Sequence, residues 1–384
     1  MEVALDFAVP REIQERQREF GAYLRRAVQP HLREWMARGE IPRTYFTELG
    51  AAGWLGFGWE GETPQERSCL ERALLLETLA ALSPGAAVAH LAQVSLGLKG
   101  ILLFGSEALR QAYVAPAARG ETLLCLGHTE AAAGSDAAAI QMRADRVEGG
   151  WILNGAKAFV TNGSAADFGV LTAVSEPEAA RNHRASMYLV DLRSPGVTRF
   201  KLDKRVWIPS DLTRLTLSDV FVPEENLLGR RGRGLHQVLE IFGLSRILIA
   251  AMTVGTAKGA FELAFEHGKN RKAFDTRLID FEAKGFEAAD LFAELESSRL
   301  AVWRACCAVD EGRDFRLEGS IAKYLAVKTA RSVTQWAADF FGAVSVLFGH
   351  PVHNFPLDAW ASSLGEGTQD IQKLVIIREL LRRG

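Results

Sequence analysis

Residues 363–372 read SLGEGTQDIQ, with one carboxylate between two glycines, just before a helical run that ends near Arg383. Glycine tolerates backbone angles that other residues avoid and lets other groups approach closely. The sequence therefore predicts a bend that holds Glu366 with unobstructed sides. Thr368 and Asp370 stand where the N-terminal cap of the following helix is expected. Taken alone, the stretch is better explained as a plain helix start with a solvated glutamate, so other parts of the chain must decide.

The composition is that of an ordinary globular protein large enough for two or three domains. The chain has 384 residues, of which 48% are hydrophobic and 24% charged. A net charge of −2 with interspersed signs gives no basic surface for nucleic acid or for an anionic membrane. The four cysteines show no paired spacing, which fits free thiols in a reducing compartment. No uninterrupted run of 18 apolar residues and no N-terminal apolar segment occurs, so we expect a cytoplasmic protein.

The hydrophobic pattern changes twice along the chain. From residue 11 to about 120, apolar residues recur at helical spacing, interrupted by Ser83-Pro84-Gly85 and by Gly105. From about 121 to 229, short alternating segments are separated by turns with glycine or proline, which is typical of β strands. Helical spacing then returns in four runs, at 235–267, 277–309, 317–346 and 370–383.

These changes predict an α+β protein built from three domains. We expect an N-terminal all-α domain at 1–120, a small middle β-barrel or β-sandwich domain at 121–229, and a C-terminal four-helix bundle at 230–384.

A loop of small residues, TEAAAGSD at Thr129–Asp136, follows the first predicted strand and could bind a polar ligand. Its small side chains leave the backbone accessible, and Thr129 and Ser135 supply hydroxyl groups. A turn around Gly134 could direct amide groups at an anion or a carbonyl. The plainer interpretation is a flexible loop rich in glycine and alanine.

The second motif, LNGAKAFVTNG at Leu153–Gly163, is predicted to form a hairpin that turns at Asn154-Gly155. Since side chains alternate along a strand, Phe159 and Thr161 should share one face. A flat ring beside a hydroxyl would suit a planar heteroaromatic cofactor. A routine hairpin with no ligand is the alternative.

Several common site motifs do not occur in the sequence. There is no P-loop, no G-x-G-x-x-G after a strand and no G-x-S-x-G. His350 and His353 stand three residues apart, but Pro351 opposes a helix between them and no third ligand is evident, so we expect no metal site.

Together, these motifs resemble those of the acyl-CoA dehydrogenase family over essentially the whole chain. The family patterns T-E-x-x-A-G-S-D and L-N-G-x-K-x-x-I-T-N-G are matched by Thr129–Asp136 and Leu153–Gly163. The family pattern D-A-x-x-x-x-I-Y-E-G-T-x-x-I-Q is matched by residues 358–372. The order of helices, β domain and helices is also the family's architecture. The resemblance implies FAD-dependent α,β-dehydrogenation of an acyl thioester such as acyl-CoA, by a homo-oligomer that is usually a dimer of dimers.

The resemblance also implies roles for individual residues. Glu366 matches the catalytic base. Some relatives carry the base on a bundle helix directly before an arginine, where this chain has Ser245 and Arg246, so the base is left to Glu366. The residues implied in FAD binding are Leu126, Thr129, Gly134, Ser135, Phe159, Thr161, Thr368 and Asp370, together with Arg271 and Phe274 from a neighbouring subunit. The residues implied in substrate binding are Ser135, Ser245, Arg246 and Gly367.

Three positions depart from the family pattern. Gly365 stands where tyrosine or phenylalanine is usual, which suggests a wider acyl pocket for a branched, cyclic or bulky group. The stretch Asp339–Ser345 keeps one glycine of Q-x-x-G-G-x-G and places an acidic residue near the expected FAD pyrophosphate. The stretch Trp207–Thr213 keeps only the threonine of G-x-R-x-S-x-T, on the carrier side of the substrate.

These departures leave alternatives open. The acyl carrier could be an acyl carrier protein instead of CoA. The dehydrogenase interpretation implies an electron acceptor, most simply an electron-transferring flavoprotein. A flavin oxidase or monooxygenase with the same fold, acting on a non-thioester substrate, is a second possibility. A relative without flavin that binds acyl groups or partner proteins is a third.

Overall fold

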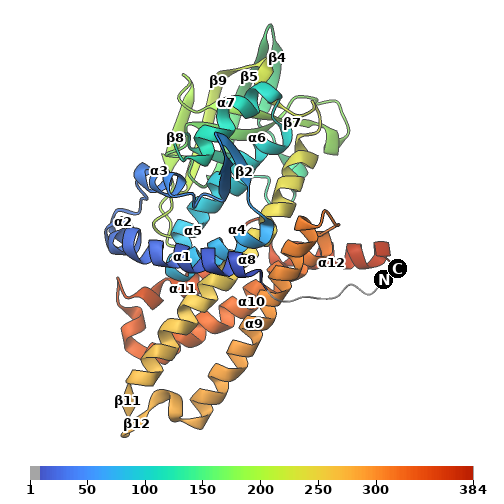
Figure 1. Ribbon diagram of the computed structural model, residues 1–384. Coiled ribbons are helices and arrows are strands. Elements are labelled where there is room, and N and C mark those ends of the chain that lie inside the picture. The colour runs from blue at the N-terminus through green and yellow to red at the C-terminus, as the bar shows by residue number, and fades with distance from the viewer. Residues whose placement is uncertain (1–8, 384) are drawn as a thin grey trace.

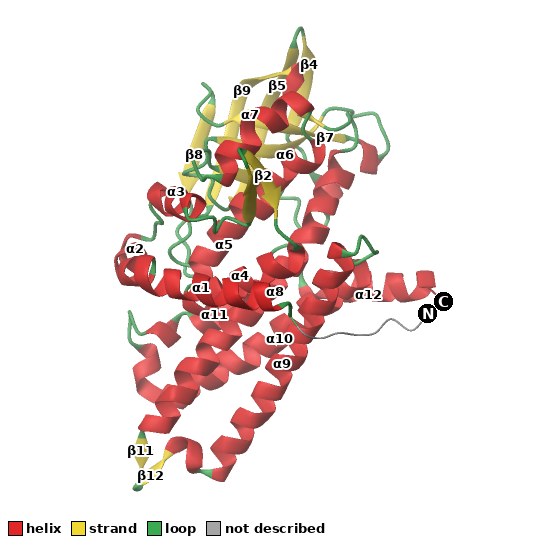
Figure 2. Ribbon diagram, in the orientation of Figure 1, coloured by secondary structure: helices red, strands yellow, loops and turns green. Residues whose placement is uncertain are grey.

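The computed structural model describes residues 9–383; residues 1–8, which begin the predicted N-terminal domain, and Gly384 lie outside the described residues. The large sheet lies at one end of the molecule, and long helices extend from it to the opposite end (Figures 1 and 2). The predicted order of helices, β domain and helices is confirmed.

The N-terminal part is helical, as predicted, apart from one hairpin. Ser68, Ser83 and Ser106 cap three of its helices by accepting a hydrogen bond from the amide three residues on. The helices are α1 Arg11–Ala27, α2 Leu32–Arg38, α3 Arg43–Ala51, α4 Cys69–Leu82, α5 Pro84–Leu91, α6 Leu98–Phe104 and α7 Glu107–Ala118, and a π-helical stretch, Ala92–Gly97, joins α5 to α6.

The hairpin pairs β1 Phe57–Glu60 with β2 Thr63–Glu66 and turns at Gly61. The prediction of an all-α N-terminal domain is therefore wrong at this segment. The sequence signal was weak because the two strands are short and β2 is mostly exposed and polar, so hydrophobic alternation is missing.

In the described chain, the middle domain is built on one eight-stranded sheet with the order β10-β7-β6-β4-β5-β9-β8, in which β3 runs parallel to β6. Trp151 and Tyr188 pack edge to face in its core. The strands are β3 Leu124–Gly127, β4 Arg143–Val147, β5 Gly150–Val160, β6 Phe168–Val174, β7 Ala185–Asp191, β8 Val197–Lys201, β9 Thr213–Pro223 and β10 Leu227–Leu228.

The hairpin predicted at Asn154-Gly155 is wrong, because β5 continues through both residues and pairs with β9. The register shifts between Leu153 and Gly155, so this glycine forms a β-bulge instead of a turn. A second irregularity precedes Val160, where Phe159 has φ +56°. Strand alternation is broken there, and Phe159 and Thr161 do not share a face by simple alternation.

The C-terminal part contains three long helices and two shorter ones. The predicted third run is helical only to Phe341, since Gly342 with φ +64° ends the α-helix and begins a 3-10 turn. The helices are α8 Gly234–Asn270, α9 Glu282–Asp310, α10 Arg316–Phe341, α11 Phe355–Ala361 and α12 Gln369–Arg383, and a hairpin of β11 Lys272–Ala273 and β12 Thr276–Arg277 joins α8 to α9. The helix α11 was not predicted. The helix α12 packs against α10 and extends to one side of the bundle (Figure 1).

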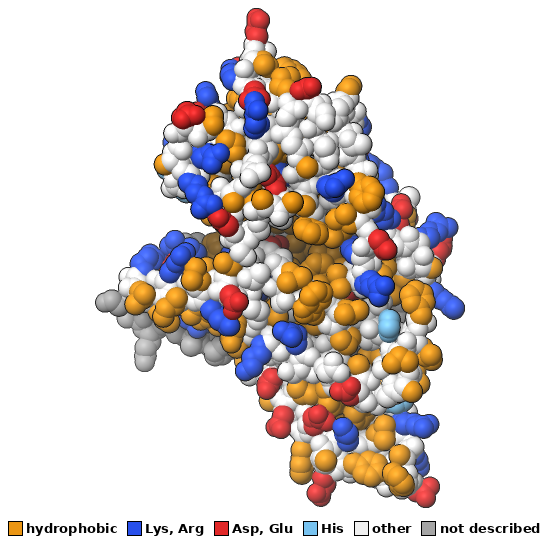
Figure 3. Space-filling view, turned by 180° about the vertical axis from the view of Figure 1, so that it is seen from behind, with side chains coloured by type: hydrophobic (Ala, Val, Ile, Leu, Met, Phe, Trp, Pro, Cys, Tyr) orange, Lys and Arg blue, Asp and Glu red, His pale blue; other side chains and the backbone are white. Residues whose placement is uncertain are grey.

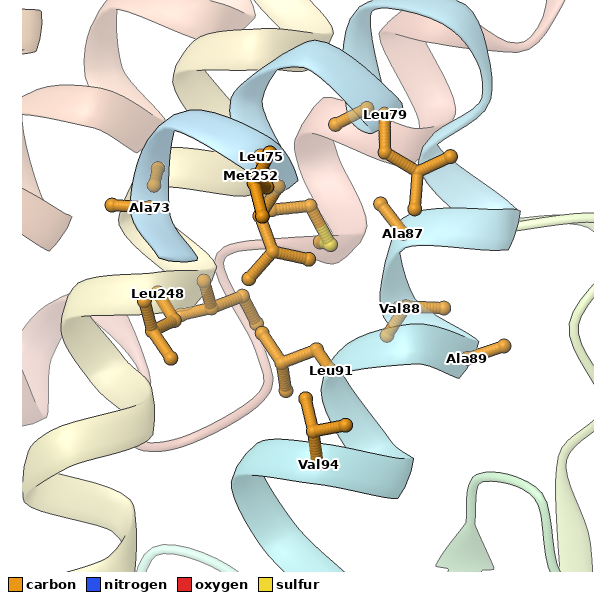
Figure 4. Close-up of a cluster of buried hydrophobic side chains, with 14 of the residues drawn as sticks. Ala73, Leu75, Leu79, Ala87, Val88, Ala89, Leu91, Val94, Leu248 and Met252 are labelled. Carbon is orange, nitrogen blue, oxygen red and sulfur yellow. The ribbon is translucent and has the colours of Figure 1, made fainter. Parts of the chain in front are cut away.

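Among the described residues, two segments reach the length and hydropathy of a membrane span, Pro84–Phe104 and Gly234–Asn270. In their most apolar 18-residue stretches, however, 78% and 72% of the residues are buried inside the fold. Both belong to the central core. Figure 4 shows that core where side chains of α4, α5 and α8 meet, among them Leu75, Leu91 and Met252.

Two glycines allow α8 to lie directly against α4. A Cβ atom at Gly255 would lie 2.2 Å from the carbonyl oxygen of Glu77, and one at Gly259 would lie 2.1 Å from that of Ala81. Neither contact leaves room for a methyl group, and the obstacle in each case is backbone. The spacing of four residues places both glycines on one face of α8.

We expect Gly255→Ala to lower stability by about 1–3 kcal/mol, because the new methyl group must push two central helices apart. The midpoint of thermal unfolding measures the effect. Gly243→Ala on the same helix is the matched control, since its Cβ would meet only Phe315 Cε2 at 3.6 Å. That control should be neutral or stabilising by about 0.5–1 kcal/mol. Equal midpoints for the two variants would show that the helices do not meet as described.

Candidate active site

The connection between α11 and α12 places Glu366 on a tight bend. Glu366 has φ +54° and Gly367 has φ +92°, so two successive residues are left-handed. Such a conformation is costly for glutamate and persists only where the surroundings enforce it. Gln372 Nε2 donates to the carbonyl of Gly367 at 2.8 Å, and the amide of Ile371 donates to Thr368 Oγ1 at 3.4 Å. The predicted bend and the predicted threonine cap are both confirmed.

The carbonyl groups of the bend are held by two cationic side chains from different helices. Lys323 of α10 donates through Nζ to the carbonyl of Gly365 and, at 2.6 Å, to that of Gly367. Arg246 of α8 donates through Nε to the carbonyl of Glu366 at 3.5 Å. The backbone of the bend is therefore attached to the two central helices of the bundle.

The carboxyl group of Glu366 lies in a poorly solvated position. Although the residue as a whole is only half-buried, its Oε2 atom is buried and has no hydrogen-bond partner within residues 9–383. Burial raises the pKa of Glu366 to about 7, while Lys323, Ser245 and Arg246 each act to lower it. A carboxyl group that titrates near neutral pH suits a general base. An unpaired buried oxygen also suits a group whose partner arrives with a ligand.

The loop after β3 is fixed by a buried ion pair. Lys157 of β5 is fully buried, and its Nζ lies 2.6 Å from Glu130 Oε1. Glu130 also accepts hydrogen bonds from the amides of Gln141 at 2.7 Å and Met142 at 3.1 Å. Lys157 donates in addition to the carbonyl of His128 at 3.2 Å. The first and last residues of the loop are thus attached to one charged pair.

Between these anchors the loop exposes a bare surface. In the part of the chain that the structure describes, no atom comes within 4 Å of a Cβ built on Gly134, and Ser135 is exposed. The amide of Ala158 donates to the carbonyl of Thr129 at 2.8 Å, so the two β-domain motifs lie side by side. Next to them, Phe159 leaves 63% of its surface exposed.

Leu126 at the end of β3 and Thr161 just beyond β5 are both partly buried. The structure therefore brings together Leu126, Thr129, Phe159 and Thr161 around the strand ends. This part of the predicted site forms an exposed ring and accessible backbone next to a rigid sheet.

The helix α8 connects the two halves of the site. The rings of His128, directly after β3, and Phe242 of α8 lie 6.0 Å apart in an edge-to-face arrangement. Phe242 precedes Ser245 and Arg246 by about one helical turn. On the face seen in Figure 3, hydrophobic side chains gather across the middle, between the broad upper part and the helices below.

The structure does not bring Arg271 and Phe274 to this site. Arg271 follows the end of α8, 25 residues beyond Arg246, which corresponds to about 38 Å along the helix. Phe274 is 92% exposed at the tip of the β11–β12 hairpin (Figure 1). Asp370 is exposed in the first turn of α12 and pairs with Lys373 at 3.1 Å.

The stretch Trp207–Thr213, which departs from the family pattern, is attached to α11, the helix that precedes Glu366. The amide of Trp207 donates to Asp358 Oδ1 of α11 at 2.5 Å, and Lys204 Nζ donates to the carbonyl of Trp207 at 2.7 Å. Burial raises the pKa of Asp358 to about 7, against the lowering effect of that amide and of Lys204. This loop therefore helps to place α11, and α11 leads into the bend.

Sequence reasoning did not single out Lys323. The signal that could have found it is its position in α10, where Ala322, Ala326 and Ala330 are fully buried on the same helix. A lysine on the buried face of an amphipathic helix is rare unless a partner satisfies it.

Three family models match the chain in succession. They are the acyl-CoA dehydrogenase N-terminal domain at residues 10–121, the middle domain at 125–220 and the C-terminal domain at 232–381. The short-chain specific acyl-CoA dehydrogenase of Megasphaera elsdenii is 32% identical over 359 residues, which cover 92% of this chain and 94% of that protein. The mitochondrial short-chain specific acyl-CoA dehydrogenase of Mus musculus is 31% identical over 89% of this chain and 83% of its own length.

Solved structures show the same relationship. Butyryl-CoA dehydrogenase from Megasphaera elsdenii superposes with a TM-score of 0.94 at 31% identity, over 98% of this chain and all of that one. A chain from work on the electron transferring flavoprotein of Acidaminococcus fermentans gives 0.95 at 30% identity, over 98% of this chain and all of its own. PigA with FAD and proline gives 0.93 at 24% identity, which supports the fold alone. The chain belongs to the acyl-CoA dehydrogenase family, whose members are FAD-dependent oxidoreductases.

Proposed function

We propose that the protein removes a proton and a hydride from the α- and β-carbons of an acyl-CoA thioester, with Glu366 as the catalytic base and a trans-2-enoyl thioester as product. The observation that carries this proposal is the state of the Glu366 carboxyl group. It is buried at one oxygen, it is unpaired there, and its pKa is raised to about 7. A solvated helix-start glutamate, the plainer interpretation of the sequence, has none of these properties.

The α-proton of a thioester is weakly acidic, so its removal needs a base whose proton affinity is raised. Burial supplies this for Glu366, because the protonated form is neutral and suits the poorly solvated position. Lys323 and Arg246, which donate to the backbone carbonyls of the bend, keep Glu366 in place while the proton is transferred. FAD, when bound, accepts the hydride that leaves the β-carbon.

The residues at the strand ends fit a flavin. The exposed ring of Phe159 offers a flat apolar surface, and the partly buried Thr129 and Thr161 add hydroxyl groups at the same strand ends. The open space over Gly134 and the exposed Ser135 leave the loop backbone free to contact a polar group. We assign FAD binding to these residues and to Leu126.

We infer that a second copy of the chain completes the cofactor site. Arg271 follows the C-terminal end of α8 and Phe274 lies in the hairpin beyond it, so both are too far from the Glu366 of their own chain, and Phe274 is almost fully exposed. A homo-oligomer, arranged as a dimer of dimers, would place them at a partner's FAD. Thr368 and Asp370 at the start of α12 are assigned to the same cofactor.

We assign substrate binding to Ser135, Ser245, Arg246 and Gly367, and we propose a short or branched acyl group. A Cβ at Gly365 would meet only Ile249 Cδ1, at 3.6 Å, among the described residues, so the position usually filled by a ring is open. The similarity to enzymes named short-chain specific supports a small substrate. An acyl carrier protein thioester is the alternative carrier.

We further infer that the electrons pass to an electron-transferring flavoprotein, which the similarity to a chain studied with such a protein supports. A cytoplasmic location is part of the same proposal and follows from the sequence composition.

We expect Glu366→Gln to bind FAD but to lose about 10²–10⁴-fold in the rate of flavin reduction, because the base is gone. The measurement is the anaerobic bleaching of the visible flavin absorbance by a panel of short, branched and medium acyl-CoAs. Glu262→Gln, an exposed carboxylate on α8, is the control and should react like the unchanged enzyme.

A Glu366→Gln variant that reduces its flavin at the normal rate would refute the assignment of the base. A yellow enzyme that no acyl-CoA bleaches, but that a carrier-protein thioester does, would identify the alternative carrier. A protein that stays colourless with excess FAD would support the alternative of a family relative that binds no flavin.

The pH dependence of kcat/KM provides a separate prediction. Because the pKa of Glu366 is raised to about 7, the group is protonated and inactive as a base below that pH. We expect kcat/KM to rise about tenfold per pH unit up to pH ~7. An acidic limb near pH ~4.3, where an unperturbed glutamate titrates, would contradict the proposed environment of Glu366.

A further inference from the structure

Lys323 is a fully buried lysine that the chemistry described so far does not use. Placing an ammonium group in a protein interior costs several kcal/mol unless its hydrogen bonds and charge are compensated. Both of its hydrogen bonds go to backbone carbonyl oxygens, those of Gly365 and Gly367, and neither goes to a carboxylate. Since these two residues flank Glu366, the lysine binds the backbone on each side of it.

The backbone of the bend needs such support. Glu366 and Gly367 are both left-handed, and for the glutamate this costs on the order of 1–3 kcal/mol. The residues around it are small, so little apolar surface is available to hold the loop by packing. From α10, Lys323 donates to the carbonyls of Gly365 and Gly367. From α8, Arg246 donates to the carbonyl of Glu366, which lies between them.

We propose that Lys323 is a positioning residue of this active site, whose ammonium group clamps the carbonyls on both sides of Glu366 and so fixes where the carboxylate stands. The inference rests on the proposed role of Glu366 as base. The lysine touches neither substrate nor cofactor in this scheme and acts only through Glu366 and the bend that holds it.

The charge of Lys323 has a second effect on the same residue. The groups that face Glu366 are Ser245 and Arg246 from α8, Lys323 from α10 and Gln372 from α12. Burial raises the pKa of Glu366, and Lys323 is the largest of the influences that lower it. Burial in turn lowers the pKa of Lys323 to about 7, and the Glu366 charge opposes that shift. The charge on each of the two side chains therefore stabilises the charged form of the other.

Removal of the ammonium group should loosen the bend and raise the pKa of Glu366 further. Both effects reduce the fraction of enzyme with a carboxylate in the correct place at neutral pH. A lysine that served only to fill space would show neither effect: its loss would lower the melting temperature and leave the bend and its titration unchanged.

The test compares Lys323→Met, which keeps the length of the side chain but has no charge and no donor, with Lys328→Met as control. Lys328 is exposed on the same helix. For both FAD-loaded variants we would measure amide hydrogen exchange of residues 362–372 and the pH profile of anaerobic flavin reduction by an acyl-CoA.

We expect Lys323→Met to increase exchange in 362–372 and to slow flavin reduction at neutral pH by about 10²-fold, the cost of a misplaced catalytic group. The acidic limb of its profile should move upward by about one pH unit or more, as expected when a nearby opposite charge is lost. Lys328→Met should match the unchanged enzyme in exchange, in the rate of flavin reduction and in the position of the acidic limb.

Unchanged exchange together with an unshifted acidic limb in Lys323→Met would overturn the proposal, whatever happens to the melting temperature. If Lys323→Met does not fold, Lys323→Gln replaces it, because the amide keeps donors but lacks the charge. For Lys323→Gln, we expect a smaller rise in exchange and the same upward shift of the limb. If no acyl thioester reduces the flavin of the unchanged enzyme, the proposed function fails, while the exchange comparison still decides whether Lys323 clamps the bend.

Discussion

The direct contact between α8 and α4 is the constraint on which the rest of the structure depends. It is possible only because Gly255 and Gly259 present no side chain to the neighbouring backbone. The same helix continues along α10 and touches β7, so all three parts of the chain take their position from it. Arg246 lies on this helix and binds the backbone of Glu366. A displacement of α8 would therefore move the core and the bend at Glu366 together.

Buried charged groups hold the site where hydrophobic packing cannot. The loop 131–136 and the bend 365–367 consist mainly of small residues and offer little apolar area to bury. Lys157 with Glu130 anchors the first, and Lys323 anchors the second. A buried ion adds little stability compared with a well-packed apolar residue, but its hydrogen bonds are directional. The chain therefore uses charge at these two places to fix backbone geometry, and uses apolar packing elsewhere.

Much of the fold was predictable because its signals are local. The change from helical to alternating hydrophobic spacing located the sheet, and the interruptions at Ser83-Pro84-Gly85 and at Gly105 fall where α4 and α6 end. The two glycines around Glu366 predicted the bend that the structure shows. Periodicity could not show the bulge at Gly155, since Asn-Gly is a turn signal in isolation and only the pairing of β5 with β9 keeps the strand continuous.

The part of the site that the sequence did not reveal depends on contacts between distant residues. Lys323 lies 43 positions before Glu366, and nothing local to either residue indicates that the first binds the backbone around the second. The sequence did single out Phe159, but its exposure follows from a left-handed backbone at an irregular pairing with β9, which simple alternation does not predict. Tertiary hydrogen bonds and sheet register decide both cases, and a single sequence contains neither.

The opposing influences on Glu366 explain why the proposed base needs both a buried position and cations nearby. Burial alone would leave the carboxyl group protonated at neutral pH and unable to accept a proton. Cations alone would keep it ionised but would lower its proton affinity, which makes a weak base. Burial is the stronger influence here, and Lys323, Ser245 and Arg246 oppose it, with a resulting pKa of about 7. At that value a substantial fraction of the enzyme carries the carboxylate while its affinity for a proton remains high. Lys323 and Arg246 both donate hydrogen bonds to the bend and both lower the pKa of Glu366, so the position and the basicity of Glu366 are linked.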